Sequence, residues 1–188
     1  MNKNNTKIIN YEETDVTTIR KNYLTELWGT SVWNKCFKRN LFEGCLFPVG
    51  LLYEDYWILP KLLFKANSIR IINKAFYNYD RTIASSISRQ LDSKHRYFKF
   101  KAKLENEIFA LSNCVEVYHA LERKTVAEAR RCIFKYYFDN SLDGSRVEEI
   151  KEYLRTKSLT GKEKFWIDRI LNNDILICKI YAKIRGYC

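Results

Sequence analysis

Helical periodicity fills the second half of the chain almost without a break. Apolar side chains recur there at three- and four-residue spacing, which is the pattern of amphipathic helices. Thr125, with Glu128 three residues later, predicts a helix N-terminus with a capping box. Glycine and proline are scarce, at 6 and 2 residues, which argues against an all-β sandwich. The helices expected from this pattern cover residues 90–122, 125–140, 145–155, 161–171 and 175–184.

The first half of the chain mixes helical and extended patterns. Ile69 and Ile71 alternate with Arg70, which is the period of a strand. Helices are expected at residues 11–28 and 54–66. A loop that contains glycine and proline is expected at residues 42–52, and two strands at residues 68–75 and 76–79. We therefore predict an α/β fold, with a sheet-containing domain in residues 1–88 and an all-helical C-terminal extension in residues 89–188.

The chain is strongly basic, with a formal net charge of +11 over 188 residues. Such a surface favours anionic partners. The excess is concentrated in residues 89–103 and 178–188. The basic and aromatic run Arg96–Lys101 suggests a nucleic-acid binder, but no nucleic-acid motif accompanies it. A run of charges is usually a solvated helix face, so we do not expect nucleic acid as the partner.

The last expected helix, residues 175–184, combines isoleucines and leucine with Lys179 and Lys183. A basic amphipathic helix of this kind can lie on an anionic membrane surface, here through residues 174–188. The alternative is that the same apolar side chains pack against the preceding helices. Both interpretations fit the sequence.

Six cysteines are present without a C-x-x-C pair or a close Cys/His cluster, so the spacing does not favour a zinc site. The N-terminus has no apolar segment typical of a signal peptide. No apolar run reaches the roughly 18 residues that a membrane span requires. We expect a cytoplasmic protein with reduced thiols, peripheral to the inner face of the membrane if the last helix binds lipid.

Four blocks in the first half occur in an informative order. They read VWNKCFKRNLF (Val32–Phe42), FPVGLLYED (Phe47–Asp55), PKLLFKANSIRII (Pro60–Ile72) and FYNYDRTIASSIS (Phe76–Ser88). In this order and spacing they resemble the C-terminal, acceptor-side half of family 2 glycosyltransferases of the GT-A fold, of the bacterial surface-polysaccharide type. The resemblance covers about residues 10–90 and implies a partial Rossmann-like sheet region ahead of the helical extension.

The resemblance implies that Asp55 is the general base of an inverting sugar transfer. A sugar hydroxyl is a poor nucleophile, and a positioned carboxylate that accepts its proton accelerates the attack on a nucleotide-sugar. Glu54 would hydrogen-bond the acceptor or cap the helix. The alternative is that both acids only complement the dipole of the helix that begins there.

Four further residues are candidates for substrate binding. Lys35 and Arg39 could face the acceptor pocket or the diphosphate, and Trp33 and Arg81 lie in the matching blocks. The structural alternative places Trp33 in the core and pairs the cations with carboxylates such as Glu54.

The donor half of a complete GT-A enzyme carries a D-x-D motif that binds Mg²⁺ or Mn²⁺. No D-x-D motif occurs in this sequence, so we expect no metal site or cofactor in this chain, and Mg²⁺ or Mn²⁺ only together with a donor half. The nucleotide-sugar and the glycan acceptor are then partners of the complete domain. The sequence leaves three explanations for the missing donor half: a fragment, a degenerate gene, or a half-enzyme that needs a partner chain.

Uncovered sheet edges in such a half-domain predict a homo-oligomer or pairing with a partner chain. The competing function is a non-catalytic interaction module on a degenerate glycosyltransferase scaffold, which the lack of a D-x-D motif favours.

Overall fold

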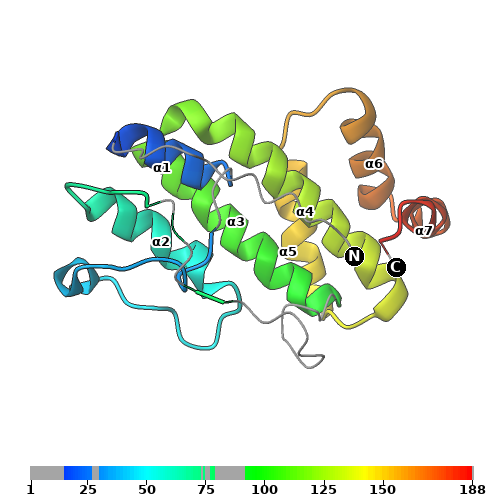
Figure 1. Cartoon of the computed structure of the whole chain (residues 1–188). Helices are drawn as coiled ribbons and strands as arrows, with labels where there is room; N and C mark the ends of the chain where they lie inside the picture. The colour runs from blue at the N-terminus through cyan, green and yellow to red at the C-terminus, as the bar shows by residue number, and fades with distance from the viewer. Residues whose placement is uncertain (1–14, 27–29, 73, 75–76, 79–91, 188) are drawn as a thin grey trace, which may run out of the picture.

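The computed structural model describes residues 15–26, 30–72, 74, 77–78 and 92–187. Within these residues the chain forms helices joined by turns and loops, and no strand occurs. The elements, shown in Figure 1, are α1 (Val16–Leu24), the 3₁₀ helix η1 (Arg39–Phe42), α2 (Glu54–Lys65), α3 (Ser93–Asn113), the 3₁₀ helix η3 (Val115–Val117), α4 (Tyr118–Asp139), α5 (Gly144–Arg155), α6 (Gly161–Leu171) and α7 (Ile175–Ile184).

The prediction of an α/β fold with a partial GT-A sheet is therefore wrong for the described part of the chain. Residues 67–72 follow α2 as irregular backbone, with Ile69 half-buried and Ile72 60% exposed. A strand needs a neighbour to complete its hydrogen-bond ladder, and the described residues offer none. Alternation of Ile69 and Ile71 alone did not make a strand. Residues 76 and 79 of the second expected strand and the predicted boundary at residue 88 lie outside the described residues.

The helical predictions fared better, with one error in the longest segment. The helix expected at 54–66 is confirmed as α2, and those expected near 145, 161 and 175 are confirmed as α5, α6 and α7. The helix expected over 90–122 instead ends at Asn113, and α4 begins at Tyr118. Thr125 lies inside α4, where its hydroxyl donates to the carbonyl oxygen of Leu121 at 3.0 Å. The predicted capping box is therefore wrong.

Glu128 has a different role from the one expected. It lies on the inner face of α4, with 1% of its surface exposed. Its carboxylate accepts a hydrogen bond from the Arg96 guanidinium of α3 at 2.9 Å, and Arg131 lies 3.5 Å away. A buried carboxylate needs such partners because burial removes its hydration. The pair thus joins α3 to α4.

Helices α3 and α4 form a long antiparallel pair through the centre of the molecule, with α5, α6 and α7 packed beside α4 (Figure 1). Their largest hydrophobic cluster includes the fully buried side chains of Phe100, Ile133, Phe134, Ile150 and Ile170. The short connection from Asn113 to Tyr118 favours this antiparallel neighbour arrangement. The helical extension is therefore a packed unit with its own core.

A smaller core lies under α1 and α2. Tyr23 from α1 packs there against an apolar face of α2 made of Ile58, Leu59, Leu62 and Leu63. A third cluster, around Leu24 and Ala110, connects α1 to α3 and η3. The element that carries Asp55 is therefore fixed on one side by α1 and on the other by α3.

Arg20 strengthens the contact between α1 and α2. Its guanidinium donates to the carbonyl oxygens of Leu63, Phe64 and Ala66 at 3.0, 3.1 and 3.0 Å. The last carbonyls of a helix lack partners within the helix, so a cation there satisfies them and complements the helix dipole. Arg20 is thus a C-terminal cap for α2 supplied from a distant part of the chain.

The helices in the described ranges are all too short or too polar to cross a membrane. The five cysteines that the structure describes, at positions 36, 45, 114, 132 and 178, are free thiols.

Candidate functional site

The loop that precedes α2 turns sharply into the helix. Gly44 and Gly50 have left-handed backbone, with φ of 68° and 76°, and Tyr53 directly before α2 has φ of 60°. The Tyr53 ring packs edge-on against Tyr56 at 6.3 Å, and the ammonium of Lys99 lies 5.8 Å from its centre. These contacts connect the loop to α3. The loop therefore delivers Asp55 to the first turn of α2 in a defined position.

Asp55 is half-buried, whereas the adjacent Glu54 is exposed. Burial raises the pKa of the Asp55 carboxyl above its ordinary value, and the neighbouring charge of Glu54 acts in the same direction. The backbone N–H of Tyr56 donates to Asp55 Oδ1 at 2.9 Å, and this bond together with the charge of Lys35 moderates the increase. The result is a carboxylate with a higher proton affinity than a surface aspartate.

Lys35 is close enough to Asp55 for each to affect the pKa of the other. Burial lowers the pKa of Lys35 to about 8, and the carboxylate of Asp55 opposes this shift. The ammonium donates to the carbonyl oxygen of Ser31 at 2.6 Å and to Asn34 Oδ1 at 2.8 Å. The structure thus brings together two of the residues expected in the site, an acid and a base with shifted pKa values.

Two tyrosines accompany this pair, and no sequence motif indicated them. The ring of Tyr23 lies 5.9 Å from the Lys35 ammonium, and burial raises the pKa of its hydroxyl. Burial also raises the pKa of Tyr56 to about 12. Tyr23 was not among the residues expected in the site. Its position beside Lys35 depends on the packing of α1 against α2, which local sequence does not specify.

The remaining candidates lie apart from this pair or outside the described residues. Trp33 is 44% exposed, so it is not the core residue that the structural alternative supposed, and its ring lies 4.8 Å from that of Tyr77. Arg39 is exposed at the start of η1, and among the described residues it forms no ion pair with Glu54 or Asp55. Arg81 lies outside the described residues.

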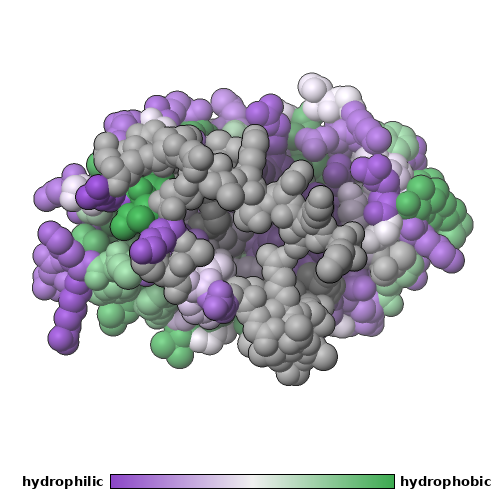
Figure 2. Space-filling model, in the orientation of Figure 1, coloured by the Kyte–Doolittle hydropathy of each residue, from purple (hydrophilic) through white to green (hydrophobic). Residues whose placement is uncertain are grey.

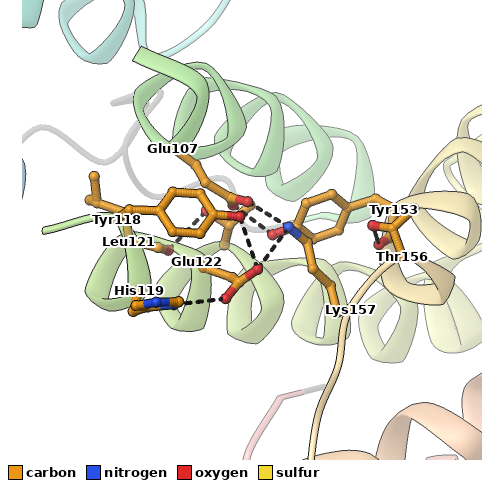
Figure 3. Close-up of polar contacts among 9 residues, drawn as sticks. Glu107, Tyr118, His119, Leu121, Glu122, Tyr153, Thr156 and Lys157 are labelled. Atoms are coloured by element: carbon orange, nitrogen blue, oxygen red, sulfur yellow. Dashed lines mark hydrogen bonds and ion pairs between the residues drawn. The ribbon is translucent and has the colours of Figure 1, made fainter. Parts of the chain in front are cut away.

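A second polar cluster, far from Asp55 in sequence, joins α3, α4 and the end of α5 (Figure 3). Lys157 donates to Glu107 at 2.6 Å and to Glu122 at 3.1 Å, and the hydroxyl of Tyr153 donates to Glu107 at 2.6 Å. Tyr118 adds a hydrogen bond to Glu122 at 3.1 Å. Glu107 is 3% exposed, so its charge requires these partners. The groups satisfy one another, which is the pattern of a structural network.

The basic run that suggested nucleic-acid binding is largely engaged within the fold. Arg96 binds Glu128, and Lys101 forms an ion pair of 2.5 Å with Glu149. Lys103, just after the run, forms an ion pair of 2.5 Å with Glu26. These cations are neutralised by nearby acids, which leaves less positive charge for phosphate groups.

No group of three or more His, Cys, Asp or Glu in the described ranges could hold a metal ion. The described residues therefore do not fit a Mg²⁺ or Mn²⁺ site. No protein-family model, curated protein or solved structure matches this chain.

Proposed function

We propose that the chain supplies the acceptor-side portion of an inverting glycosyltransferase, with Asp55 as the general base. In this reaction the Asp55 carboxylate accepts the proton of an acceptor hydroxyl. The hydroxyl oxygen forms a bond to the anomeric carbon of a nucleotide-sugar as the bond from that carbon to the phosphate oxygen breaks. The nucleoside diphosphate leaves with the bonding electrons, and the configuration of the sugar inverts.

The observation that carries the proposal is the environment of Asp55. A general base works best when its pKa is not far below the working pH, because it must be ionised and still attract a proton. Burial moves the pKa of Asp55 in that direction. The sequence blocks that flank Asp55 supply the sugar-transfer interpretation.

Lys35 supports the proposal as a positioning residue. Its positive charge favours the ionised form of Asp55, so the carboxylate stays ready to accept a proton despite its burial. The lowered pKa of Lys35 shows that its charge responds to its surroundings. Together, Lys35 and Asp55 can keep a carboxylate oxygen of Asp55 able to accept a proton in a partly desolvated site.

The role of Asp55 as a base does not depend on a sheet in this chain. The nucleotide-sugar donor, with Mg²⁺ or Mn²⁺ where the donor half requires one, is expected from the sequence resemblance alone. The acceptor is a polysaccharide or a lipid-linked glycan on the cytoplasmic side of a membrane, where nucleotide-sugars would meet it. A partner chain or a second copy would contribute the donor-binding groups.

The test is release of nucleoside diphosphate from a panel of nucleotide-sugars. The purified chain is mixed with a membrane extract from source cells that lack the gene, which supplies the acceptor and any partner. We expect release that depends on the added chain. Asp55→Asn should lower the rate by about 10²–10⁴-fold, the usual contribution of a general base. Asparagine can still accept the Tyr56 hydrogen bond, so this variant should fold.

Asp143→Asn is the matched control. Asp143 accepts a hydrogen bond from the backbone N–H of Arg146 at 3.0 Å at the start of α5, far along the chain from Asp55. This variant should retain the wild-type rate. Equal rates for Asp55→Asn and wild type would remove the base assignment. No release by the wild-type chain with any donor would favour the non-catalytic interaction module instead.

A further inference from the structure

Helix α7 has two apolar faces, and only one of them is used in the fold. Cys178 and Ala182 are fully buried against the helical core, and the Tyr181 ring stacks on Trp166 of α6 at 3.7 Å. These contacts fix α7 against α4 and α6. One face of α7 therefore packs against the preceding helices, as one of the two interpretations of the sequence expected.

The other face of α7 is exposed to solvent. Leu176, Ile180 and Ile184 are 73, 54 and 77% exposed. Their four-residue spacing places them in one row along the helix. Ile177, 42% exposed, lies beside that row. Figure 2 shows the resulting hydrophobic surface at the end of the molecule where Figure 1 places α7, with hydrophilic residues around it.

Positive charge borders this row. Lys179 and Lys183 come one residue before Ile180 and Ile184, so they lie on one side of the exposed face, and Arg185 follows the helix. Residues 175–187 contain no Asp or Glu. Among the described residues, neither lysine takes part in an ion pair, and the Lys179 ammonium lies 5.7 Å from the ring of Phe138. The row thus has a cationic edge.

From this surface we propose that α7 binds the surface of an anionic lipid bilayer. Leu176, Ile180 and Ile184 would enter the boundary between headgroups and acyl chains, where apolar burial stabilises an interfacial helix. Lys179, Lys183 and Arg185 would contact lipid phosphates, and each such cation adds to the attraction. The inference does not depend on the role of Asp55.

The charge pattern selects a bilayer over a second copy of the chain. Two copies of α7 placed face to face would bring the cations of both helices to one interface without an acid from either helix. Like charges at an interface weaken association. A surface of anionic headgroups over an apolar interior complements both the row and its edge.

The experiment measures partition of the purified full chain onto large vesicles by co-sedimentation. One set of vesicles contains equal parts of phosphatidylcholine and phosphatidylglycerol, and the other contains phosphatidylcholine alone. We expect strong binding to the anionic vesicles and weak binding to the neutral ones. The variant L176S/I180S/I184S should lose more than about tenfold in partition. The variant K183Q/R185Q should lose about thirtyfold on anionic vesicles, since each cation contributes about 1 kcal/mol there.

The variant I108S/L111S/V115S is the matched control, because its three apolar side chains are also more than half exposed, at 54, 52 and 65%, but lie on α3 and η3. It should bind as the wild type does. Circular dichroism checks that all variants remain helical. Equal binding of the α7 variant and the wild type, or equal binding to both vesicle types, would overturn the proposal. So would a wild-type dimer that L176S/I180S/I184S converts to a monomer without any vesicle binding.

Discussion

At the scale of single residues, the sequence identified Asp55 but not its surroundings. An acid that follows a glycine-containing loop at a helix start can be recognised locally, and α2 begins where it was expected, at Glu54. Burial lowers the pKa of Lys35, and the ring of Tyr23 from α1 lies 5.9 Å from its ammonium. Tyr23 is 12 positions away from Lys35 in the sequence, and no local pattern reports such a contact. Local sequence therefore indicated Asp55 and Lys35 as candidates but not the packing around them.

Lys35 provides a prediction about pH at the residue scale. Its ammonium, which is charged below its pKa of about 8, lowers the pKa of the Asp55 carboxyl, which burial raises. Removing this charge should raise the pKa of Asp55 further, so a higher pH is needed to ionise the base. In the variant Lys35→Met, the acid limb of the rate of sugar transfer should therefore move to higher pH. The measurement is the rate of nucleoside diphosphate release as a function of pH.

The control for this prediction is Lys38→Met, because Lys38 is an exposed lysine in the same segment. It should keep the wild-type profile. An acid limb at the same pH in Lys35→Met and the wild type would show that the charge of Lys35 does not act on the base.

At the scale of secondary-structure elements, long helices with regular apolar spacing were predictable and short extended segments were not. The positions of α5, α6 and α7 were expected within a few residues because each has a strong apolar stripe and a clear start. The break between α3 and α4 was expected at residues 123–124, too late in the chain, because polar side chains such as Thr125 and Glu128 imitate a helix start. Burial of Glu128 beside Arg96 is a tertiary feature, and it overrides the local signal.

At the scale of elements, the contact of Arg20 with the end of α2 leads to a prediction about stability. The variant Arg20→Met removes three hydrogen bonds to the C-terminal carbonyls of α2 and should lower the free energy of unfolding by about 2–3 kcal/mol. Methionine keeps much of the apolar stem that packs there. Urea unfolding followed by circular dichroism measures the effect. Arg123→Met, at an exposed position on α4, should change stability by less than about 0.5 kcal/mol. Equal losses in the two variants would mean that the cap contributes nothing specific.

At the scale of the whole molecule, hydrophobic clusters and a few buried charge networks hold the described helices together. The network of Glu107, Glu122 and Lys157 connects the central helix pair to the end of α5 (Figure 3). Nothing in the sequence indicated it, because Glu107 and Glu122 lie on different helices and Lys157 follows the end of a third. The apolar spacing predicted which faces are buried, while the polar contacts that fix one arrangement depended on the complete fold.

From this network we predict that the free energy of unfolding decreases at low pH. Burial by itself would raise the pKa of Glu122, but hydrogen bonds from Lys157 and Tyr118 outweigh it, and the pKa lies below the ordinary value of 4.5. A lowered carboxyl pKa contributes stability that is complete above about 4.5 and is lost as the pH falls through the lower folded value. Glu122→Gln should therefore lose less stability than the wild type between neutral pH and strong acid, by about 1 kcal/mol.

Urea unfolding at the two pH values measures this difference. Glu163→Gln, which changes a partly exposed acid in the first turn of α6, should follow the wild type at both pH values. An identical acid response in wild type and Glu122→Gln would show that the ion pair with Lys157 has no net effect on folding.

The left-handed backbone at Tyr53 has a consequence for which sequences this site tolerates. Glycine at that position would relieve a conformational cost of about 1–2 kcal/mol, since tyrosine has a Cβ that disfavours positive φ. The same change would remove the ring that contacts Tyr56 and Lys99. Relief of backbone strain and anchoring of the loop by the tyrosine ring thus favour different residues at this position. A library of all substitutions at residue 53, sorted separately for folding and for sugar transfer, should select different residues in the two screens.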